Sequence, residues 1–312
     1  MEIVWLLLSF VILYYGAEGL VFGASSLAKR LGISALVIGL TIVSIGTSMP
    51  ELLVSIKAAM NGQSAISIGN ALGSNLFNIG IILGLSAIIY PLLAKKQLLK
   101  FDVPVMILTS VLFLLLFLDS KISRIEAILM VILFLSYTTY LLVSSKRKHN
   151  INPNRDEDDD IKLTKHWALD IVFIVVGLVA LVWGSDLLVV NAIIIAERLG
   201  MSEAMIGLTI VAAGTSMPEL ATSAVAAFKK RSDIAIGNIV GSNIFNILLI
   251  LGVAGIIQPI STPDINYIDA LVVVALGVLL WLFMKMSASI RRWQGVVFIV
   301  LYVLYIMFKM TA

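Results

Sequence analysis

The chain has 312 residues, of which 60% are hydrophobic and only 13% are charged. A soluble domain is nearer half apolar and a quarter charged, and so few charges could not cover the outside of such an apolar globule. The composition therefore excludes a soluble protein, and the mean hydropathy of +1.05 agrees. There is no cysteine, which excludes disulfides, thiolate metal sites and cysteine nucleophiles, and two histidines in one polar stretch argue against imidazole metal sites.

A membrane span needs about 20 mostly apolar residues. The N-terminal MEIVWLLLSF has no basic leader, so we interpret it as a first span and not as a cleaved signal. We therefore expect an all-α integral membrane protein with ten transmembrane helices, at 3–27, 33–60, 66–91, 101–118, 123–144, 167–195, 203–228, 234–259, 267–286 and 292–310. A polar linker at 146–166 divides them into a first five-helix half, 1–145, and a second, 167–312.

The basic residues predict the orientation of the spans. When the connections are numbered alternately by side, 17 of the 22 lysines and arginines lie on one side and 5 on the other. Because the basic side of a membrane protein faces the cytoplasm, we expect both termini outside and the 146–166 linker in the cytoplasm. The expected location is the plasma membrane, with the lipid bilayer as surroundings, no nucleic-acid partner, no cofactor and a monomeric working unit.

The two halves repeat one sequence at an offset of 168 residues. LGISALVIGLTIVSIGTSMPE at 31–51 returns at 199–219 as LGMSEAMIGLTIVAAGTSMPE, and 33 of 54 positions are identical between 31–84 and 199–252. Five spans is an odd number, so the second copy enters the membrane from the opposite side. Inverted repeats of this kind are typical of secondary transporters, whose site lies near mid-membrane where the repeats meet.

Two acidic residues lie near the middle of predicted spans, at equivalent positions of the repeat. Glu51 and Glu219 end the motif GTSMPE, and Pro50 and Pro218 precede them. A mid-membrane charge costs roughly 2.5–3.5 kcal/mol even on lenient scales, so such residues are functional candidates by default. A proline breaks the helix and frees the carbonyl four residues earlier, which offers a cation a hard oxygen ligand. The alternative is a protonated structural carboxyl.

Other oxygen-bearing side chains follow the same helical faces. The first copy places Ser44, Thr47, Ser48, Glu51 and Ser55 at three- and four-residue spacing, and Asn70, Ser74 and Asn78 form a second stripe; the matching stripes in the second copy are Ala212, Thr215, Ser216, Glu219 and Ser223, and Asn238, Ser242 and Asn246. Hydroxyl, amide and carboxylate groups suit Na⁺ and Ca²⁺. For any single Ser or Thr, backbone hydrogen bonding or helix packing remains an alternative.

A second pair of acidic residues also lies within the spans. Glu18 and Asp186 occur in the first span of each half and are related by the 168-residue offset. A polar anchor for helix packing and a carboxylate on the ion entry path are both open interpretations.

The repeated segments, with GTSMPE and GSN-x-F-N in both halves, resemble the alpha repeats of the calcium/cation antiporter superfamily, and most closely its prokaryotic sodium/calcium exchangers. The resemblance implies four ion sites between two inverted repeats, and a gate formed by the first span of each half. It implies that Ca²⁺ is bound by the carboxylates of Glu51 and Glu219 and the carbonyls of Thr47 and Thr215. It implies that Na⁺ is bound by the same two carboxylates, by the carbonyls of Ser44 and Ala212, and by the hydroxyls of Ser48, Ser74, Ser216 and Ser242. Asn78 and Asn246 would lie beside the site.

The resemblance also bears on the counter-ion. Potassium-dependent relatives have Asp at the position of Asn246, and this chain has Asn in both halves, which argues against potassium dependence. Proton-coupled relatives tend to have Asn in place of the Thr-Ser pair that both copies keep here. We therefore expect Na⁺/Ca²⁺ exchange, with a proton-coupled Ca²⁺ or divalent-cation exchanger as the alternative.

Three rival functions fit the sequence less well. An ion channel needs a continuous pore, whereas inverted repeats favour alternating access. An intramembrane hydrolase would need a His or Lys base at mid-depth, and the sequence offers none there. A Ca²⁺ sensor has only DEDDD at 156–160 as support, and this acidic run lacks EF-hand spacing.

Overall fold

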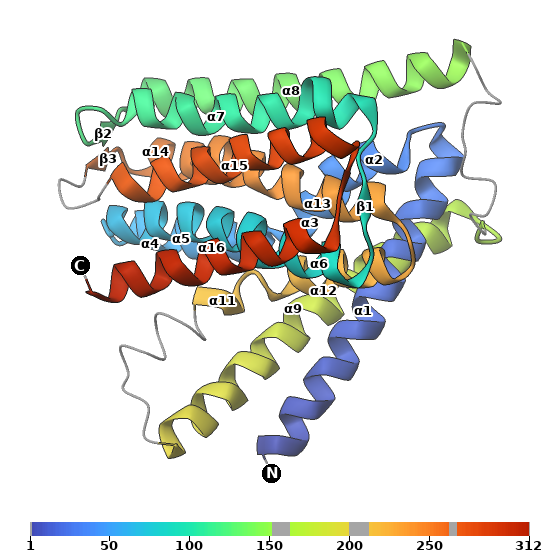
Figure 1. Ribbon diagram of the computed structural model, residues 1–312, viewed down its shortest axis with the longest axis horizontal. Coiled ribbons are helices and arrows are strands. Elements are labelled where there is room, and N and C mark those ends of the chain that lie inside the picture. The colour runs from blue at the N-terminus through green and yellow to red at the C-terminus, as the bar shows by residue number, and fades with distance from the viewer. Residues whose placement is uncertain (1, 152–162, 200–211, 262–266, 312) are drawn as a thin grey trace.

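The computed structural model describes residues 2–151, 163–199, 212–261 and 267–311, and these are almost entirely helical (Figure 1). The first half contains α1 (Glu2–Leu31), α2 (Ala35–Ile38), η1 (Gly39–Val43), α3 (Ser44–Thr47), α4 (Met49–Met60), α5 (Ser64–Phe77), η2 (Asn78–Ile82), α6 (Leu83–Ile89), η3 (Leu98–Asp102), α7 (Val103–Leu116) and α8 (Arg124–Ile151), where η marks a π-helical segment. The second half contains α9 (Trp167–Arg198), α11 (Ala212–Gly214), α12 (Met217–Phe228), α13 (Ser232–Phe245), η6 (Asn246–Ile250), α14 (Leu251–Ile257), α15 (Tyr267–Ser287) and α16 (Arg292–Thr311).

The described helices account for most of the predicted membrane spans. Eight continuous helical runs are long and apolar enough to cross a membrane, and the bent pair 35–47 and 49–60 makes a ninth. The first part of the predicted span 203–228 lies outside the described residues, and α12 forms its second part. The all-helical membrane class is confirmed, and the count of ten stays a prediction.

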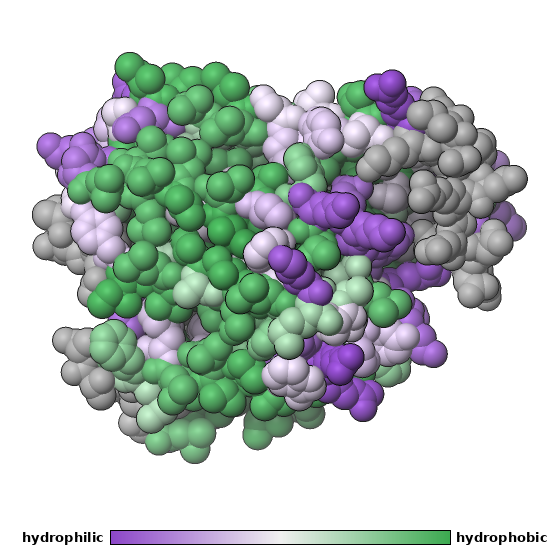
Figure 2. Space-filling model, turned by 45° about the horizontal axis from the view of Figure 1, so that its top comes forward, coloured by the Kyte–Doolittle hydropathy of each residue, from purple (hydrophilic) through white to green (hydrophobic). Residues whose placement is uncertain are grey.

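Two helical runs form the centre of the bundle. In the most apolar stretches of runs 64–89 and 232–257, 72% and 83% of the residues are buried, compared with 17–39% in the other continuous spans. The outer helices α7, α8, α15 and α16 pack around this centre and turn large apolar side chains outward. Figure 2 shows the resulting broad hydrophobic face, with most hydrophilic residues toward its right side and a smaller group at its upper left edge. Such a surface is what lipid tails solvate.

Helices α1 and α9 form a slanted pair at one side of the bundle (Figure 1). They approach so closely that a Cβ on Gly177 would lie 2.7 Å from the carbonyl oxygen of Gly16. They run antiparallel, because an ion pair joins the end of each helix to the start of the other. Arg30 Nε lies 2.9 Å from Asp170 Oδ2, and Arg198 Nη2 lies 2.8 Å from Glu2 Oε1.

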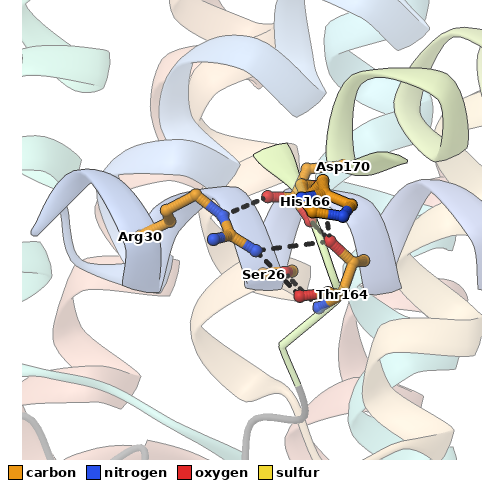
Figure 3. Close-up of polar contacts among 5 residues, drawn as sticks. All are labelled: Ser26, Arg30, Thr164, His166 and Asp170. Carbon is orange, nitrogen blue, oxygen red and sulfur yellow. Dashed lines mark hydrogen bonds and ion pairs between the residues drawn. The ribbon is translucent and has the colours of Figure 1, made fainter. Parts of the chain in front are cut away.

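The ion pair of Asp170 belongs to a larger polar cluster (Figure 3). Thr164 donates its hydroxyl to Asp170 Oδ1 at 2.6 Å, and its backbone N–H donates to Ser26 Oγ at 3.0 Å. Arg30 also donates to the Thr164 carbonyl at 2.9 Å. The segment that leads into α9 is therefore fixed to the end of α1.

Two short antiparallel β-bridges close the ends of the bundle. Strand β1 (Leu92–Leu93) pairs with β4 (Ser289–Ile290), and β2 (Lys121–Ile122) pairs with β3 (Ile260–Ser261). The 168-residue offset relates β1 to β3 and β2 to β4. The bounds of α4, α5, η2 and α6 reappear at the same offset in α12, α13, η6 and α14.

Helix α8 extends beyond the predicted span 123–144. Helix α8 continues to Ile151, into the residues assigned to the 146–166 linker. The polar residues from Lys146 onward carry no helix-breaking residue before Pro153, so the helix has no local reason to stop at the membrane surface. The acidic run 156–160 lies outside the described residues.

Candidate cation-binding site

The first half brings a broken helix to the centre of the bundle, and in the second half α11 and α12 meet at a turn there. The run 35–47 meets α4 at an angle of 48°, with Ser48 at the break. Pro50 lies in the first turn of α4 and Pro218 in the first turn of α12, where a missing N–H costs no helical hydrogen bond. The break leaves each first turn, with its glutamate, facing the bundle centre.

The two glutamates are held reciprocally by the other half. Glu51 and Glu219 are each 1% exposed. Ser216 donates to Glu51 Oε1 at 2.9 Å, and Ser48 donates to Glu219 Oε1 at 2.6 Å. The same hydroxyls also contact neighbouring helices: Ser48 reaches Ser242 Oγ at 3.0 Å, and Ser216 reaches Ser74 Oγ at 3.2 Å. The structure thus brings six of the predicted site residues together, with matched contacts in the two halves.

Four side-chain oxygens of this centre have no hydrogen-bond partner among the described residues. They are Glu51 Oε2, Glu219 Oε2, Asn78 Oδ1 and Asn246 Oδ1, and all four are buried. A buried acceptor without a donor costs about 1–3 kcal/mol, and more for a charged group. Carboxylate and amide oxygens are the ligands that hard cations take, so a bound Na⁺ or Ca²⁺ would satisfy them.

Two asparagines support the backbone that carries each glutamate. Asn70 donates to the Glu51 carbonyl at 3.0 Å and to Ser55 Oγ at 2.9 Å. Asn238 is its repeat mate, the residue at the equivalent position 168 residues later in the other half. Asn238 donates to Ser223 Oγ at 3.0 Å and accepts from the Thr47 hydroxyl at 3.1 Å. The spacing of the sequence placed these amides on the site face, and their role here is to fix neighbouring groups.

Sequence reasoning assigned no role to the asparagines of the GSN motifs. Asn75 donates to the Asn243 carbonyl at 3.2 Å, and Asn246 donates to Asn75 Oδ1 at 3.0 Å. These contacts join the two central helices directly at the site. The sequence did contain a signal for this role, because an asparagine occurs at the same position of both repeats within an apolar span.

The predicted carbonyl ligands differ in their surroundings. Thr47 is fully buried, whereas Thr215 lies half-buried in the turn between α11 and α12, and Ala212 begins α11. The Ser44 carbonyl accepts the Ser48 N–H at 3.0 Å. The carbonyl four residues before Pro218 belongs to Gly214, and the expectation that it is free for a cation needs correction, because Ser185 on α9 donates to it at 2.6 Å.

The charge of the centre comes from two carboxylates. Among the described residues no group of three or more His, Cys, Asp or Glu side chains gathers at one place. The donor set is therefore two carboxylates surrounded by hydroxyls and amides, which suits alkali and alkaline-earth ions and is a poor set for Zn²⁺.

Comparison with known proteins gives the family. Residues 1–143 and 169–311 match the family described as sodium/calcium exchanger protein. The chain is 36% identical to sodium/calcium exchanger MaX1 of Methanosarcina acetivorans over 96% of both chains, and 41% identical to the putative antiporter CaxA of Alkalimonas amylolytica over 82% of this chain and 81% of CaxA. The chain belongs to the sodium/calcium exchanger family. This membership confirms the resemblance of the repeated motifs, and it identifies a cation antiporter and not an enzyme.

The fold agrees with that of a solved exchanger. A structure of the sodium-calcium exchanger NCX_Mj superposes with a TM-score of 0.85 at 34% identity, covering 98% of each chain. A further structure of that exchanger, soaked with 10 mM Na⁺ and 10 mM Sr²⁺, gives a TM-score of 0.84. The chain therefore folds as a multi-pass membrane protein with the same overall arrangement of helices.

Proposed function

We propose that this exchanger moves Na⁺ against Ca²⁺ by alternating access, with the ions bound at mid-membrane between two inverted five-helix repeats. The observation that carries the proposal is the reciprocal pairing of Glu51 and Glu219 with serines of the opposite half, which leaves one oxygen of each carboxylate without a partner in the described part of the chain. The antiparallel course of α1 and α9 and the matched element bounds support the inverted arrangement of ten spans.

The ligands follow from this centre. The two carboxylates and the carbonyls of Thr47 and Thr215 would bind Ca²⁺. Flanking Na⁺ ions would take the same carboxylates, the hydroxyls of Ser48, Ser74, Ser216 and Ser242, and the carbonyls of Ser44 and Ala212. Asn78 and Asn246 line the site, and each offers an amide oxygen to which no described residue donates.

Charge balance gives a physical reason for obligatory exchange. Two carboxylates offset one Ca²⁺, so the Ca²⁺-loaded centre is close to neutral, and several Na⁺ can offset the same charge. An empty centre would carry two negative charges across a low-dielectric region, which is costly. The protein therefore switches readily between its outward-facing and inward-facing states when ions are bound, and only slowly when the site is empty.

The expected setting is the plasma membrane, with the working unit a monomer. Both termini lie outside and the 146–166 linker lies in the cytoplasm, as the distribution of basic residues predicts.

Flux measurements on vesicles test the function and the site together. Vesicles loaded with Na⁺ should take up external Ca²⁺ when the purified wild-type protein is present. Glu51→Gln and Glu219→Gln should each lower uptake to that of protein-free vesicles, because the carboxylate charge is lost from a buried centre. Glu197→Gln, an exposed change at the end of α9, is the control and should transport normally.

Two results would contradict these assignments separately. Equal Ca²⁺ uptake driven by a proton gradient without Na⁺ would replace Na⁺ by H⁺ as the coupled ion. Full Ca²⁺ uptake by both glutamine variants would show that Glu51 and Glu219 do not form the ion-binding site.

A further inference from the structure

Glu18 and Asp186 are repeat mates that the ion site does not use, and the structure treats them differently. The carboxylate of Glu18, midway along α1, forms an ion pair with the ammonium of Lys229, the residue that follows α12. Asp186, midway along α9, is exposed and has neither a hydrogen bond nor an ion pair among the described residues. One half of the molecule therefore makes a contact that the other half leaves open.

The packing of the helices shows the same asymmetry. Helix α1 packs along α12, but α9 makes no comparable contact with α4, the repeat mate of α12, within the described part of the chain. The two ion pairs that join α1 to α9 also differ in how far their carboxylates are buried. Asp170, which pairs with the end of α1, is 0% exposed, whereas Glu2 at the start of α1 is 25% exposed. Helix α1 is thus packed against α12 through the Glu18–Lys229 contact, whereas Asp186 on α9 has no counterpart of this contact among the described residues.

We propose that Glu18 and Lys229 form a latch that closes the ion pathway on the Lys229 side. The proposal rests on the alternating access proposed above. When the exchanger faces the other way, Asp186 makes the corresponding contact with Lys57 on α4. The repeat mate of Lys229 is Asn61, which carries no charge, and Lys57 is exposed one helical turn earlier on the same face of α4.

The energetics of an exposed pair suit this role. Both partners are accessible to solvent, with side chains 35% and 40% exposed, and exposed pairs contribute little stability. A weak contact can bias two states without trapping the protein in one of them. Because the ion pairs at both ends hold α1 to α9, release of Glu18 on one side carries Asp186 toward α4 on the other.

Distance measurements between paired spin labels test the latch directly. The sequence has no cysteine, so labels attach only where a cysteine is introduced. Leu31→Cys with Phe228→Cys reports on the α1–α12 side, and the repeat mates Leu199→Cys with Met60→Cys report on the α9–α4 side. All four residues are exposed at helix ends, so labels there disturb no packing.

The latch predicts opposite effects for its two carboxylates. Glu18→Gln should raise the ratio of long to short distances for the first label pair by about five-fold, as expected for loss of an exposed ion pair. The second label pair should shorten in the same variant. Asp186→Asn should shift both distributions in the opposite direction, and the exchange Glu18→Lys with Lys229→Glu should restore the wild-type ratio.

The same data separate failure of the latch from failure of alternating access. If the wild-type distances switch between Na⁺ and Ca²⁺ but Glu18→Gln leaves their ratio unchanged, the latch is wrong and alternating access stands. The latch is also wrong if both carboxylate variants shift the distances in the same direction. One fixed distance in the wild type and in all variants would overturn alternating access and the latch together.

Discussion

The side chains at the site divide into groups that can bind an ion and groups that hold them in place. Asn238 is of the second kind, because its amide connects Ser223 on α12 to Thr47 in the opposite half. Its own oxygen and nitrogen are both used in these contacts. Supporting groups of this kind orient metal ligands, and losing one typically costs 10–100-fold in affinity.

Asn238→Ala is therefore expected to raise the Ca²⁺ concentration for half-maximal uptake by about ten-fold. The maximal rate at saturating Ca²⁺ should fall less, because both carboxylates remain. Gln63→Ala, in the exposed turn after α4, is the control and should leave the concentration dependence unchanged. An unaltered Ca²⁺ dependence of uptake in Asn238→Ala would show that this amide does not position any group that binds the ion.

Residue spacing alone was enough to select the groups that gather at the site. Charge at mid-span marks Glu51 and Glu219, and helical periodicity adds Ser48 and Ser74. Spacing along one chain does not say which hydroxyl meets which carboxylate in the other half. Spacing also does not reveal contacts between different helices of one half, so the hydrogen bond from Ser185 on α9 to the Gly214 carbonyl, 29 residues away in sequence, could not be predicted.

At the scale of helices, the pair α1 and α9 depends on two ion pairs of unequal burial. Arg30→Gln leaves the buried Asp170 without its cation, whereas Arg198→Gln, at an exposed arginine, removes a partner from a half-buried Glu2. Breaking a buried pair costs about 3–5 kcal/mol. An exposed pair is worth about 0–1 kcal/mol.

Thermal unfolding in detergent should therefore separate these repeat mates. We expect a clear fall in Tm for Arg30→Gln and little change for Arg198→Gln. Adding Asp170→Asn to Arg30→Gln should recover part of the loss, because the uncompensated charge is gone. Equal Tm values for the two single variants would mean that burial of Asp170 contributes nothing to stability.

Close approach of backbones sets another limit on the helices. A Cβ on Gly241 would lie 2.6 Å from both the Leu40 carbonyl oxygen and Ser44 Oγ, which is closer than real contacts allow. Gly241→Ala should therefore push α13 away from η1 and α3 and lower Na⁺-driven Ca²⁺ uptake. Gly19→Ala on α1 is the control, since its Cβ would meet its nearest atom at an ordinary 3.7 Å. Equal uptake in both variants would contradict the tight fit.

The sequence predicted most helix positions because apolar length and the 168-residue offset fix them independently. It did not predict the π-helical turns that begin at Asn78 and Asn246. A π-turn adds a residue to one turn without changing composition, so no hydrophobic period reveals it. The extension of α8 to Ile151 was missed for a related reason, since a helix can leave the membrane without a change of structure.

For the whole molecule, inverted topology makes a direct prediction about the two sides of the membrane. Leu118 follows the end of α7, its repeat mate Met286 lies in the last turn of α15, and both are exposed. Single cysteines in place of these residues should react with an impermeant maleimide from opposite sides, Leu118→Cys from outside and Met286→Cys from the cytoplasm. Labelling of both from one side would contradict the inverted arrangement and the ten-span count.

The relative placement of the two halves is the part of the fold that the sequence could not supply. Repeat identity says that the halves share a structure, and an odd number of spans says that they are inverted. Neither says that Ser48 meets Glu219 across 171 positions of sequence. That contact depends on how two apolar helix bundles pack against each other. The apolar side chains at their interface do not show in the sequence which surfaces will meet.

The reciprocal contacts at the site also constrain how the protein is made. During synthesis Glu51 enters the membrane before residue 216, the donor to its carboxylate, has been added to the chain. The newly inserted first half therefore holds an acidic group without its serine donor until the second half arrives. A chain that ends after the first half should for this reason be a substrate for quality-control proteolysis, and the two halves made as separate polypeptides should protect each other.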